Sequence, residues 1–369
     1  MSPQTWTVGM GITSACNMNC PFCYSQDRRK SKDLELDMWK SFMEKNGSLI
    51  DSINYGTGEN TLSKSWYSLI TFIHEKFPDI RQALTTNGSL ALAIEEGNCA
   101  DAIEACIEEI DVSIDFADSE RHDKMRGYPG AYDMAVRTLD YCQSNGKQGT
   151  IVMLGAEEML HLENLTHLFD LAKLYNAYVR INLYRHVSKK SAFQLPKIST
   201  IMTALNWIVN NHSVVSISEP VFRSIFGVPT DCDKPAPSSM RILPNGDITP
   251  STYLITGEWV AENITHDISI RKITKTTPFQ RFMMQKIPEG CSGCPHADIC
   301  RGGTRDRRFL TWGNLDHPDI YCPIAAGELT IIESLHQPEF LKDCKTVHSD
   351  YLPTLIFSPN PNKTRHVNG

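Results

Sequence analysis

The sequence predicts an α/β protein built on a partial (β/α)6 barrel that resembles a TIM barrel, followed by a smaller cysteine-rich region. Two observations lead to this prediction. Apolar strand-like runs alternate with helix-length amphipathic segments from residue 7 to residue 185, and such alternation is typical of parallel sheets. The 369 residues are also enough for two domains, or for one large barrel with an appendage.

The expected strands lie at residues 7–12, 52–56, 81–88, 109–115, 149–155 and 178–185. The expected helices between them include residues 64–77, 131–143 and 165–175. Right-handed crossovers curl such a sheet toward a barrel, and active sites lie at the carboxyl ends of the strands. Polar and cysteine residues follow several of these strands, so we expect them at one mouth of the barrel: Cys16, Gly58, Asn87 and Asp115.

The regular alternation stops near residue 230, where Pro, Gly and Cys become frequent. Asn245-Gly246 between two strand-like runs predicts a β-hairpin within residues 240–251. We therefore expect a barrel over residues 1–220 and a cysteine-rich region with this hairpin over residues 221–330. A C-terminal helix and a disordered tail are expected over residues 331–369.

Composition narrows the class of protein. The net charge of −7 is not accompanied by a basic stripe, which argues against nucleic-acid binding. No stretch approaches the about 20 apolar residues of a membrane span, and the first residues lack the features of a secretory signal. We therefore expect a cytoplasmic protein without a membrane partner, in which thiols stay reduced.

Twelve cysteines in a reducing compartment require an explanation other than disulfides. Three form the pattern C-x3-C-x2-C: Cys16, Cys20 and Cys23. A second group has the pattern C-x2-C-x5-C with one more cysteine further on: Cys291, Cys294, Cys300 and Cys322. Thiolates are preferred ligands for zinc and for iron–sulfur clusters. No fourth cysteine or histidine near the first group completes a closed zinc site, whereas the second group allows either metal centre.

The C-x3-C-x2-C motif, with Phe22 before its third cysteine and a strand before its first, resembles that of the radical SAM superfamily. The resemblance implies that Cys16, Cys20 and Cys23 bind three irons of a [4Fe–4S] cluster, with Phe22 shielding it. The fourth iron then chelates S-adenosylmethionine, and an electron from the cluster yields a 5′-deoxyadenosyl radical that abstracts hydrogen.

Three further motifs are similar to those of the same superfamily. TGEN (57–60) implies that Gly58 and Glu59 hold the amino group of S-adenosylmethionine, although Thr57 and Asn60 depart from the usual Gly and Pro. TTNG (85–88) brings Asn87 to the cofactor. In VSIDFADSERHDKMRG (112–127) the implied contacts with the cofactor are made by Ser113 and Arg126, with Asp115 in the wall of the site. A purely structural zinc or iron–sulfur scaffold has no need for these motifs.

The second cysteine group resembles the SPASM extension of radical SAM enzymes that modify peptides. In that pattern Cys232 takes the first place, while Ser251 and Thr304 stand where two cysteines are usual. The resemblance implies that an inner auxiliary cluster is missing. One auxiliary [4Fe–4S] cluster is then held by the outer set: Cys291, Cys294, Cys300 and Cys322. A zinc ion held by the same four thiolates is the alternative.

A protein without the inner cluster is better suited to redox-neutral chemistry. The simplest such reaction is epimerisation of a residue in a ribosomally made precursor peptide, in which a cysteine thiol returns a hydrogen atom to the opposite face. Cys232 is the first candidate for this donor and Cys344 is the second. The expected partners are a precursor peptide with a leader and an electron donor such as flavodoxin or ferredoxin. C–C or thioether cross-linking of a peptide, and modification of a small molecule, remain alternatives.

Overall fold

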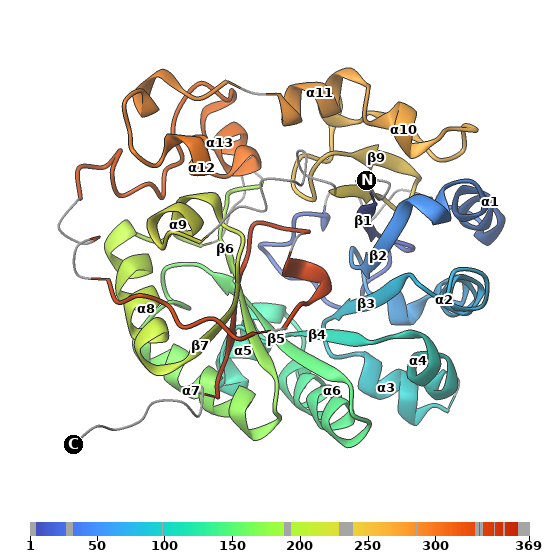
Figure 1. The fold of residues 1–369 in the computed structure, drawn as a ribbon. Coiled ribbons are helices and arrows are strands. Elements are labelled where there is room, and N and C mark those ends of the chain that lie inside the picture. The colour runs from blue at the N-terminus through green and yellow to red at the C-terminus, as the bar shows by residue number, and fades with distance from the viewer. Residues whose placement is uncertain are drawn as a thin grey trace.

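The computed structural model describes residues 5–26, 32–97, 99–187, 193–228, 239–284, 286–328, 332, 335–342, 344–349 and 351–360. Six parallel strands follow one another around the barrel in sequence order (Figure 1). They are β1 (Trp6–Met10), β2 (Ile50–Tyr55), β3 (Arg81–Thr86), β4 (Glu109–Ser113), β5 (Gln148–Gly155) and β6 (Tyr178–Leu183). Each overlaps the strand predicted for it, so the predicted fold class is confirmed.

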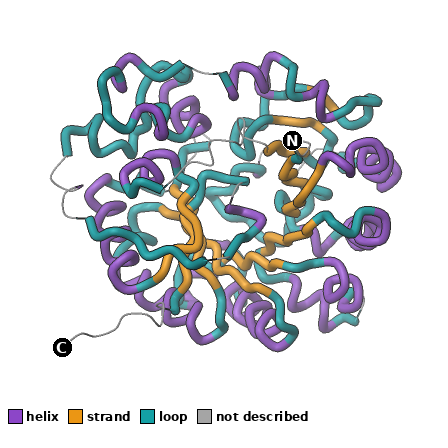
Figure 2. Tube along the Cα trace, in the orientation of Figure 1, coloured by secondary structure: helices purple, strands orange, loops and turns teal. Residues whose placement is uncertain are grey.

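Helices cover the outside of these strands (Figure 2). In α2 (Lys64–Lys76), the buried residues Trp66, Leu69, Ile70 and Ile73 form one stripe, because their spacing matches the helical repeat. The other helices of the barrel are α1 (Leu36–Asn46), α3 (Leu90–Glu95), α4 (Ala100–Cys106), α5 (Ser119–Arg126), α6 (Ala131–Ser144), α7 (Leu162–Leu174) and α8 (Ile198–Asn211).

The sheet continues beyond both ends of the predicted barrel. On one side β8 (Ser239–Ile242) pairs in parallel with β1, and β9 (Asp247–Thr249) and β10 (Glu262–Asn263) follow it. Gly246, with φ of 87°, makes the turn between β8 and β9, as the hairpin prediction requires. The hairpin that we expected in the cysteine-rich region therefore extends the barrel sheet itself, which has 11 strands in total.

The C-terminal segment is structured where we predicted a tail. Strand β11 (Leu355–Ser358) lies antiparallel between β6 and β7 (Ser213–Ile217), and all four of its residues are buried. Before it, the short 3-10 helix η6 (Val347–Ser349) packs against β2, β3 and β7 inside the barrel (Figure 1). The prediction of disorder is wrong for this strand, because a four-residue run gains its order from the two strands beside it.

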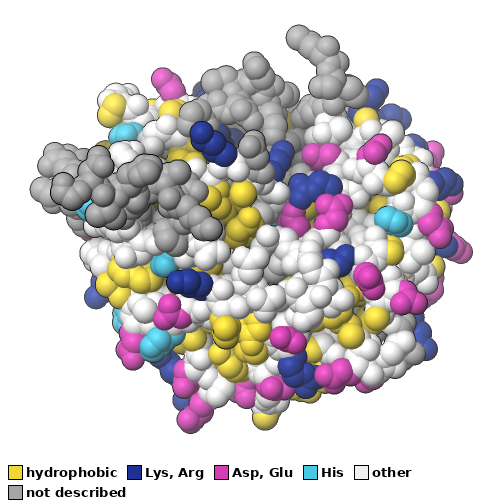
Figure 3. Space-filling view, turned by 60° about the horizontal axis from the view of Figure 1, so that its bottom comes forward, with side chains coloured by type: hydrophobic (Ala, Val, Ile, Leu, Met, Phe, Trp, Pro, Cys, Tyr) yellow, Lys and Arg dark blue, Asp and Glu magenta, His cyan; other side chains and the backbone are white. Residues whose placement is uncertain are grey.

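The remaining elements carry the cysteine-rich region. Helix α9 (Pro220–Ile225) follows β7, and the short helices α10 (Ile270–Ile273), α11 (Thr277–Met283), α12 (Ala297–Cys300) and α13 (Arg305–Trp312) lie above the barrel (Figure 1). Positive and negative side chains are interspersed on the face seen in Figure 3. Within the described ranges, every helix is too short or too polar to cross a membrane.

The packing of β11 leads to a first prediction. Phe357 is fully buried and packs against Phe169 of α7. Replacing Phe357 with Ala should lower the free energy of unfolding by about 3–5 kcal/mol, because it leaves a cavity in the core. The matched change Leu174→Ala, at a side chain that is 65% exposed, should alter it by less than about 0.5 kcal/mol. Urea unfolding measures both, and equal stabilities of the two variants would contradict the position of β11.

Candidate functional site

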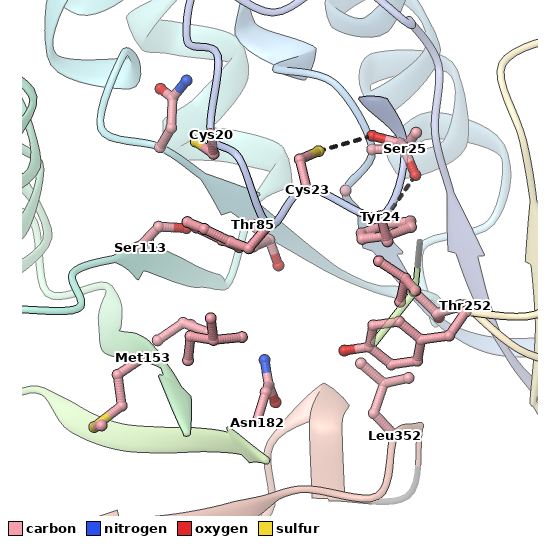
Figure 4. Close-up of a pocket in the computed structure, with 18 of the residues that line it drawn as sticks. Cys20, Cys23, Tyr24, Ser25, Thr85, Ser113, Met153, Asn182, Thr252 and Leu352 are labelled. Atoms are coloured by element: carbon pink, nitrogen blue, oxygen red, sulfur yellow. Dashed lines mark hydrogen bonds between the residues drawn. The ribbon is translucent and has the colours of Figure 1, made fainter. Parts of the chain in front are cut away.

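The three cysteines of the C-x3-C-x2-C motif line one cavity of about 220 Å³ at the carboxyl ends of the barrel strands. Figure 4 shows Cys20 and Cys23 on their loop at one side of this space, with the side-chain amide of Asn182 pointing into it from β6. Cys20 is buried, whereas Cys16 is partly accessible. Burial raises the pKa of the Cys20 thiol, partly offset by Arg126. We call this space the cysteine-loop cavity.

A close backbone contact holds the cysteine loop over the end of β2. Gly58 has φ of 62°, and a Cβ atom built on it would lie 2.4 Å from the carbonyl oxygen of Thr13 and 2.6 Å from that of Ala15. The backbone N–H of Glu59 donates to the carbonyl of Ala15 at 2.7 Å. Only glycine therefore fits at position 58, which lines the cavity as the motif predicted.

Thr57, where the motif departs from glycine, also has a left-handed backbone with φ of 98°. This conformation is unusual for a β-branched residue. Its hydroxyl group accepts a hydrogen bond from the buried guanidinium of Arg241 and lies 2.9 Å from the hydroxyl of Tyr24. The side chain thus has a polar partner at this position that a glycine would lack.

Glu59, which was predicted to contact the cofactor, does not line the cysteine-loop cavity. Its carboxylate is buried and accepts hydrogen bonds from the backbone N–H of Asn87 at 2.7 Å and from the hydroxyls of Thr86 at 3.0 Å and Thr61 at 2.9 Å. Burial raises the pKa of Glu59, and these donors partly offset the increase. Glu59 is therefore a positioning residue that ties the loop after β2 to the end of β3.

Asn87 lines the cavity and contacts the cysteine loop directly. Its side-chain amide donates to Asn17 Oδ1 at 2.9 Å and to the Sγ atom of Cys16 at 3.7 Å. Its Oδ1 atom accepts from the backbone N–H and the hydroxyl of Ser89. The orientation of the amide is thus set from both ends.

Ser113, Asp115, Arg126 and Phe22, all predicted from the resemblance, line the same cavity. Asp115 and Arg126 form a buried ion pair, and Asp115 Oδ1 also accepts from the backbone N–H of Leu154 at 2.8 Å. The guanidinium of Arg126 lies 5.2 Å from the centre of the Phe22 ring. Burial alone would lower the pKa of Arg126, but Asp115 outweighs it and raises the pKa.

His122 binds the backbone of Asp115, one member of this pair. Its Nδ1 atom accepts a hydrogen bond from the backbone N–H of Asp115 at 3.2 Å, so the ring is neutral at Nδ1. The side chain is fully buried. Burial, with a smaller contribution from Arg126, lowers the pKa of His122 to about 3.

Buried charges form the floor of the cavity. Arg180 of β6 donates to Asp111 of β4 at 2.9 Å, and His348 of η6 lies 3.0 Å from the same carboxylate. Burial would raise the pKa of Asp111, but Arg180 and His348 outweigh it and lower the pKa to about 2. Arg180, Asn182 and Tyr184, at alternate positions along the end of β6, all line the cavity.

Several lining residues were not predicted from the sequence: Arg185, Arg241, Thr252, Tyr253, His348 and Tyr351. Arg241 interrupts the apolar run MRIL of β8 and is only 1% exposed, so an isolated charge within a strand was a usable signal. No local pattern indicated Tyr253, His348 or Tyr351, because these residues come from loops and from the C-terminal segment.

The two candidate hydrogen donors have different outcomes. Cys232 lies outside the described residues. Cys344 is placed away from the cysteine-loop cavity: its Sγ atom accepts a hydrogen bond from the hydroxyl of Tyr178, the first residue of β6, at 3.7 Å. The carboxyl end of β6, not its beginning, faces the cavity. We therefore do not retain Cys344 as a donor.

The second cysteine group converges on a small pocket of about 20 Å³, which all four of its thiols line: Cys291, Cys294, Cys300 and Cys322. Burial and the neighbouring Cys322 raise the pKa of Cys300 to about 12. Burial and Cys322 likewise raise the pKa of Cys291. A bound cationic centre reverses this effect by favouring thiolates, so the donor set suits a thiolate-bound metal centre. Over the described ranges, no three His, Cys, Asp or Glu side chains converge on the position of a single metal ion.

A buried ionic network connects this region to the barrel. Glu219, at the start of α9, accepts from Arg307 through both carboxylate oxygens at 2.9 Å, and Arg307 also donates to Asp319 at 2.7 Å. The hydroxyl of Tyr321 donates to the backbone carbonyl of Tyr184 at 2.6 Å. Because Cys322 follows Tyr321, these contacts position the cysteine pocket relative to the end of β6.

Ser251 and Thr304, where the extension pattern lacks cysteines, line one further cavity of about 280 Å³. The hydroxyl of Ser251 donates to Asp306 Oδ2 at 2.8 Å, and that of Thr304 donates to Glu219 Oε2 at 2.6 Å. The two positions thus lie at one site, and each hydroxyl is already paired with a carboxylate. We call this space the second cavity.

Part of the chain is similar in sequence to a known protein family. Residues 10–169, less than half of the chain, match the model of the Radical SAM superfamily. These residues include the cysteine loop and every residue that was predicted to contact the cofactor.

Solved structures with the same fold cover both the barrel and the cysteine-rich region. The crystal structure of Streptococcus suis SuiB bound to precursor peptide SuiA has a TM-score of 0.67 and 14% identity, covering 87% of this chain and 76% of that one. Native anSMEcpe with bound AdoMet and the Cp18Cys peptide has a TM-score of 0.67 and 16% identity, covering 89% and 96%. At these identities the likeness is one of fold.

Similarity in sequence to curated proteins is confined to a shorter region. Fe-coproporphyrin III synthase of Methanosarcina barkeri is 32% identical over 142 residues, which are 37% of this chain and 33% of that protein. AdoMet-dependent heme synthase of Oleidesulfovibrio alaskensis is 26% identical over 153 residues, 39% and 37% of the two chains. The chain therefore spans little more than a third of the length of these relatives.

The neutral state of His122 predicts a pH dependence of stability. Because its folded pKa of about 3 is below the unfolded value of about 6.5, stability is complete above pH 6.5 and falls as the pH decreases toward 3. His122 alone should lower the free energy of unfolding by about 1.4 kcal/mol at pH 5.5 relative to pH 7.5. Urea unfolding at both pH values measures this decrease. In His122→Gln, the free energy of unfolding should decrease between pH 7.5 and pH 5.5 by about 1.4 kcal/mol less than in the wild type. An identical decrease in wild type and variant would show that His122 does not contribute.

Proposed function

We propose that this protein is a radical SAM enzyme that acts on a ribosomally made precursor peptide and inverts the α-carbon of selected residues from L to D. The observation that carries the first part of this proposal is the convergence of Cys16, Cys20 and Cys23 on one cavity at the carboxyl ends of the strands. Three thiolates are the ligand set that leaves one iron of a [4Fe–4S] cluster open.

The residues around the cavity suit a bound cluster and S-adenosylmethionine. When bound, these groups supply a one-electron cleavage of a sulfonium and a hydrogen-abstracting 5′-deoxyadenosyl group. Asn87 donates to the Sγ atom of Cys16, and hydrogen bonds to ligand sulfurs tune the reduction potential of a cluster. Gly58 packs closely against the cysteine loop, while the buried salt bridge of Asp115 and Arg126 lines the space that a zwitterionic ligand would occupy.

Two considerations support a peptide substrate. This chain shares the fold of SuiB, whose structure holds the precursor peptide SuiA, and of anSMEcpe, whose structure holds the Cp18Cys peptide. The cysteine pattern of residues 232–322 also resembles the extension of peptide-modifying enzymes. We propose that its outer thiols hold one auxiliary [4Fe–4S] cluster: Cys291, Cys294, Cys300 and Cys322.

Inversion is proposed because it leaves the peptide with the same number of hydrogens and electrons. One hydrogen atom leaves the α-carbon for the 5′-deoxyadenosyl group, and the donor thiol returns another to the opposite face. One electron from the proposed electron donor, a flavodoxin or ferredoxin, and one proton from solvent then restore the thiol. Ser251 and Thr304 stand where the resembling pattern has two cysteine ligands of the inner cluster. Without that cluster, the site lacks the electron acceptor that formation of an oxidised product would need. Cys232 stays our proposed hydrogen donor on the basis of its place in the sequence.

The curated relatives favour a second candidate function. Both are named for tetrapyrrole synthesis, and four buried arginines line the cysteine-loop cavity: Arg126, Arg180, Arg185 and Arg241. Guanidinium groups pair well with carboxylates, which the side chains of coproporphyrin carry. Incubation with coproporphyrin III, followed by mass spectrometry for lost carboxyl groups, separates this function from peptide modification.

Metal analysis tests the two cysteine sites. The anaerobically reconstituted protein should contain about eight irons and eight sulfides, as two [4Fe–4S] clusters require. It should form 5′-deoxyadenosine from S-adenosylmethionine under strong reductant. The combined change of Cys16, Cys20 and Cys23 to Ala should leave about four irons and abolish this product. Cys142→Ala, at a buried cysteine of α6 that lines neither site, serves as the control. Zinc bound by the N-terminal thiols would overturn the proposal.

Isotope labelling tests inversion directly. Co-expression with a candidate precursor peptide in deuterated water should add one dalton for each inverted residue, whereas a cross-link removes two hydrogens. Cys232→Ala should still form 5′-deoxyadenosine but should not yield D-residues in chiral amino-acid analysis. Cys344→Ala is the matched control, because Cys344 lies by the first residue of β6. A Cys232→Ala variant that still inverts residues would exclude Cys232 as the donor.

A further inference from the structure

The second cavity adjoins the cysteine-loop cavity. Thr252, Tyr351 and Leu352 line both spaces, and Figure 4 shows Thr252 and Leu352 at the side of the cysteine-loop cavity away from Ser113. A ligand whose reacting group lies near the cysteine loop can therefore extend past these three side chains. Whatever part of the ligand enters the second cavity meets a different set of charges.

Positive charge predominates in the second cavity. The described residues that line it include three arginines, Arg223, Arg301 and Arg305, and one carboxylate, Asp306. That carboxylate is already occupied, because its Oδ2 atom accepts from Ser251 at 2.8 Å and its Oδ1 atom lies 3.1 Å from Arg185 in the wall of the first cavity. Asp306 thus does not neutralise the arginines on the cavity side.

Arg305 is the central cation of this set. It is the first residue of α13, and its guanidinium lies 5.4 Å from the centre of the Phe282 ring. Its Nε atom is buried without a hydrogen-bond partner, and Arg305 forms no ion pair with any carboxylate of the described residues. Burial, together with Arg301 and Arg308, lowers the pKa of Arg305 to about 10. Arg305 is partly buried, and an anion in the cavity would stabilise a partly buried cation that has no counter-ion.

We propose that the second cavity binds a carboxylate side chain of the substrate, an Asp or Glu that flanks the residue modified in the cysteine-loop cavity. The guanidinium of Arg305 provides paired N–H donors that match a carboxylate. Carboxylates are the anionic side chains that an unmodified peptide carries, so this inference rests on the proposed peptide substrate. It adds a specificity-determining site to the proposed function.

Equilibrium binding without reductant tests the inference, because no reaction then takes place. The probes are the peptides acetyl-Gly-Glu-Gly-amide and acetyl-Gly-Gln-Gly-amide, titrated into the reconstituted protein and followed by ligand-observed NMR. The wild type should bind the glutamyl peptide roughly tenfold more tightly than the glutaminyl peptide, as expected for a charge-assisted hydrogen bond. Arg305→Gln should abolish this difference, and Arg305→Lys should retain part of it.

Arg137→Gln is the matched control, because Arg137 on the outside of α6 pairs with Glu95 and Asp133 and is 37% exposed. It should keep the full preference. Iron content and circular dichroism establish that each variant is folded and loaded. Equal binding of the two peptides by wild type would overturn the inference, as would a preference that survives in Arg305→Gln.

A third probe distinguishes a peptide side chain from a free acid. Glutarate should bind more weakly than the glutamyl peptide, because it lacks the backbone that extends toward the cysteine-loop cavity. Equal affinity for glutarate would overturn the assignment to a peptide. A preference for the glutamyl peptide in a protein that inverts no residue would leave this site intact and refute only the proposed reaction.

Discussion

The contact between Gly58 and the cysteine loop is the constraint on which the site depends. The backbone of Gly58 lies so close to the carbonyls of Thr13 and Ala15 that no side chain fits between them. The N–H of Glu59 secures the loop from the same side, and the Glu59 carboxylate reaches on to the end of β3. The cysteine loop thus has its position set by two strand ends.

Buried charges play a comparable role between the barrel and the cysteine-rich region. Taking Glu219, Arg307 and Asp319 out of water is expensive, and their mutual hydrogen bonds offset this only when the geometry is satisfied. The network therefore favours one arrangement of the two regions. Because Arg185 pairs with Asp306 and Tyr321 with Tyr184, the same arrangement sets the wall between the two cavities.

Two hydroxyl residues stand where the extension pattern that this region resembles has cysteines, and charged side chains lie beside them. Ser251 and Thr304 occupy those places and donate to Asp306 and Glu219, while Arg305 lines the space that they share. A polar, cationic cavity thus lies where the resembling pattern would hold a metal centre. The same two substitutions therefore bear on both proposals: they remove ligands of an electron-accepting cluster, and they leave a cavity in which Arg305 can bind a carboxylate of the substrate.

The sequence by itself determined the six parallel strands, the hairpin turn at Gly246 and the two groups of cysteines, because these depend on local periodicity, turn chemistry and spacing. It also indicated most residues around the cysteine loop, since each follows a strand at the same end of the barrel. Only the tertiary structure decided that Glu59 turns away from the cavity, because its partners Asn87 and Thr86 come from another strand. The same holds for β11, for the distant position of Cys344 and for the cluster of Arg223, Arg301 and Arg305. Each depends on contacts between segments far apart in the chain, which no local pattern records.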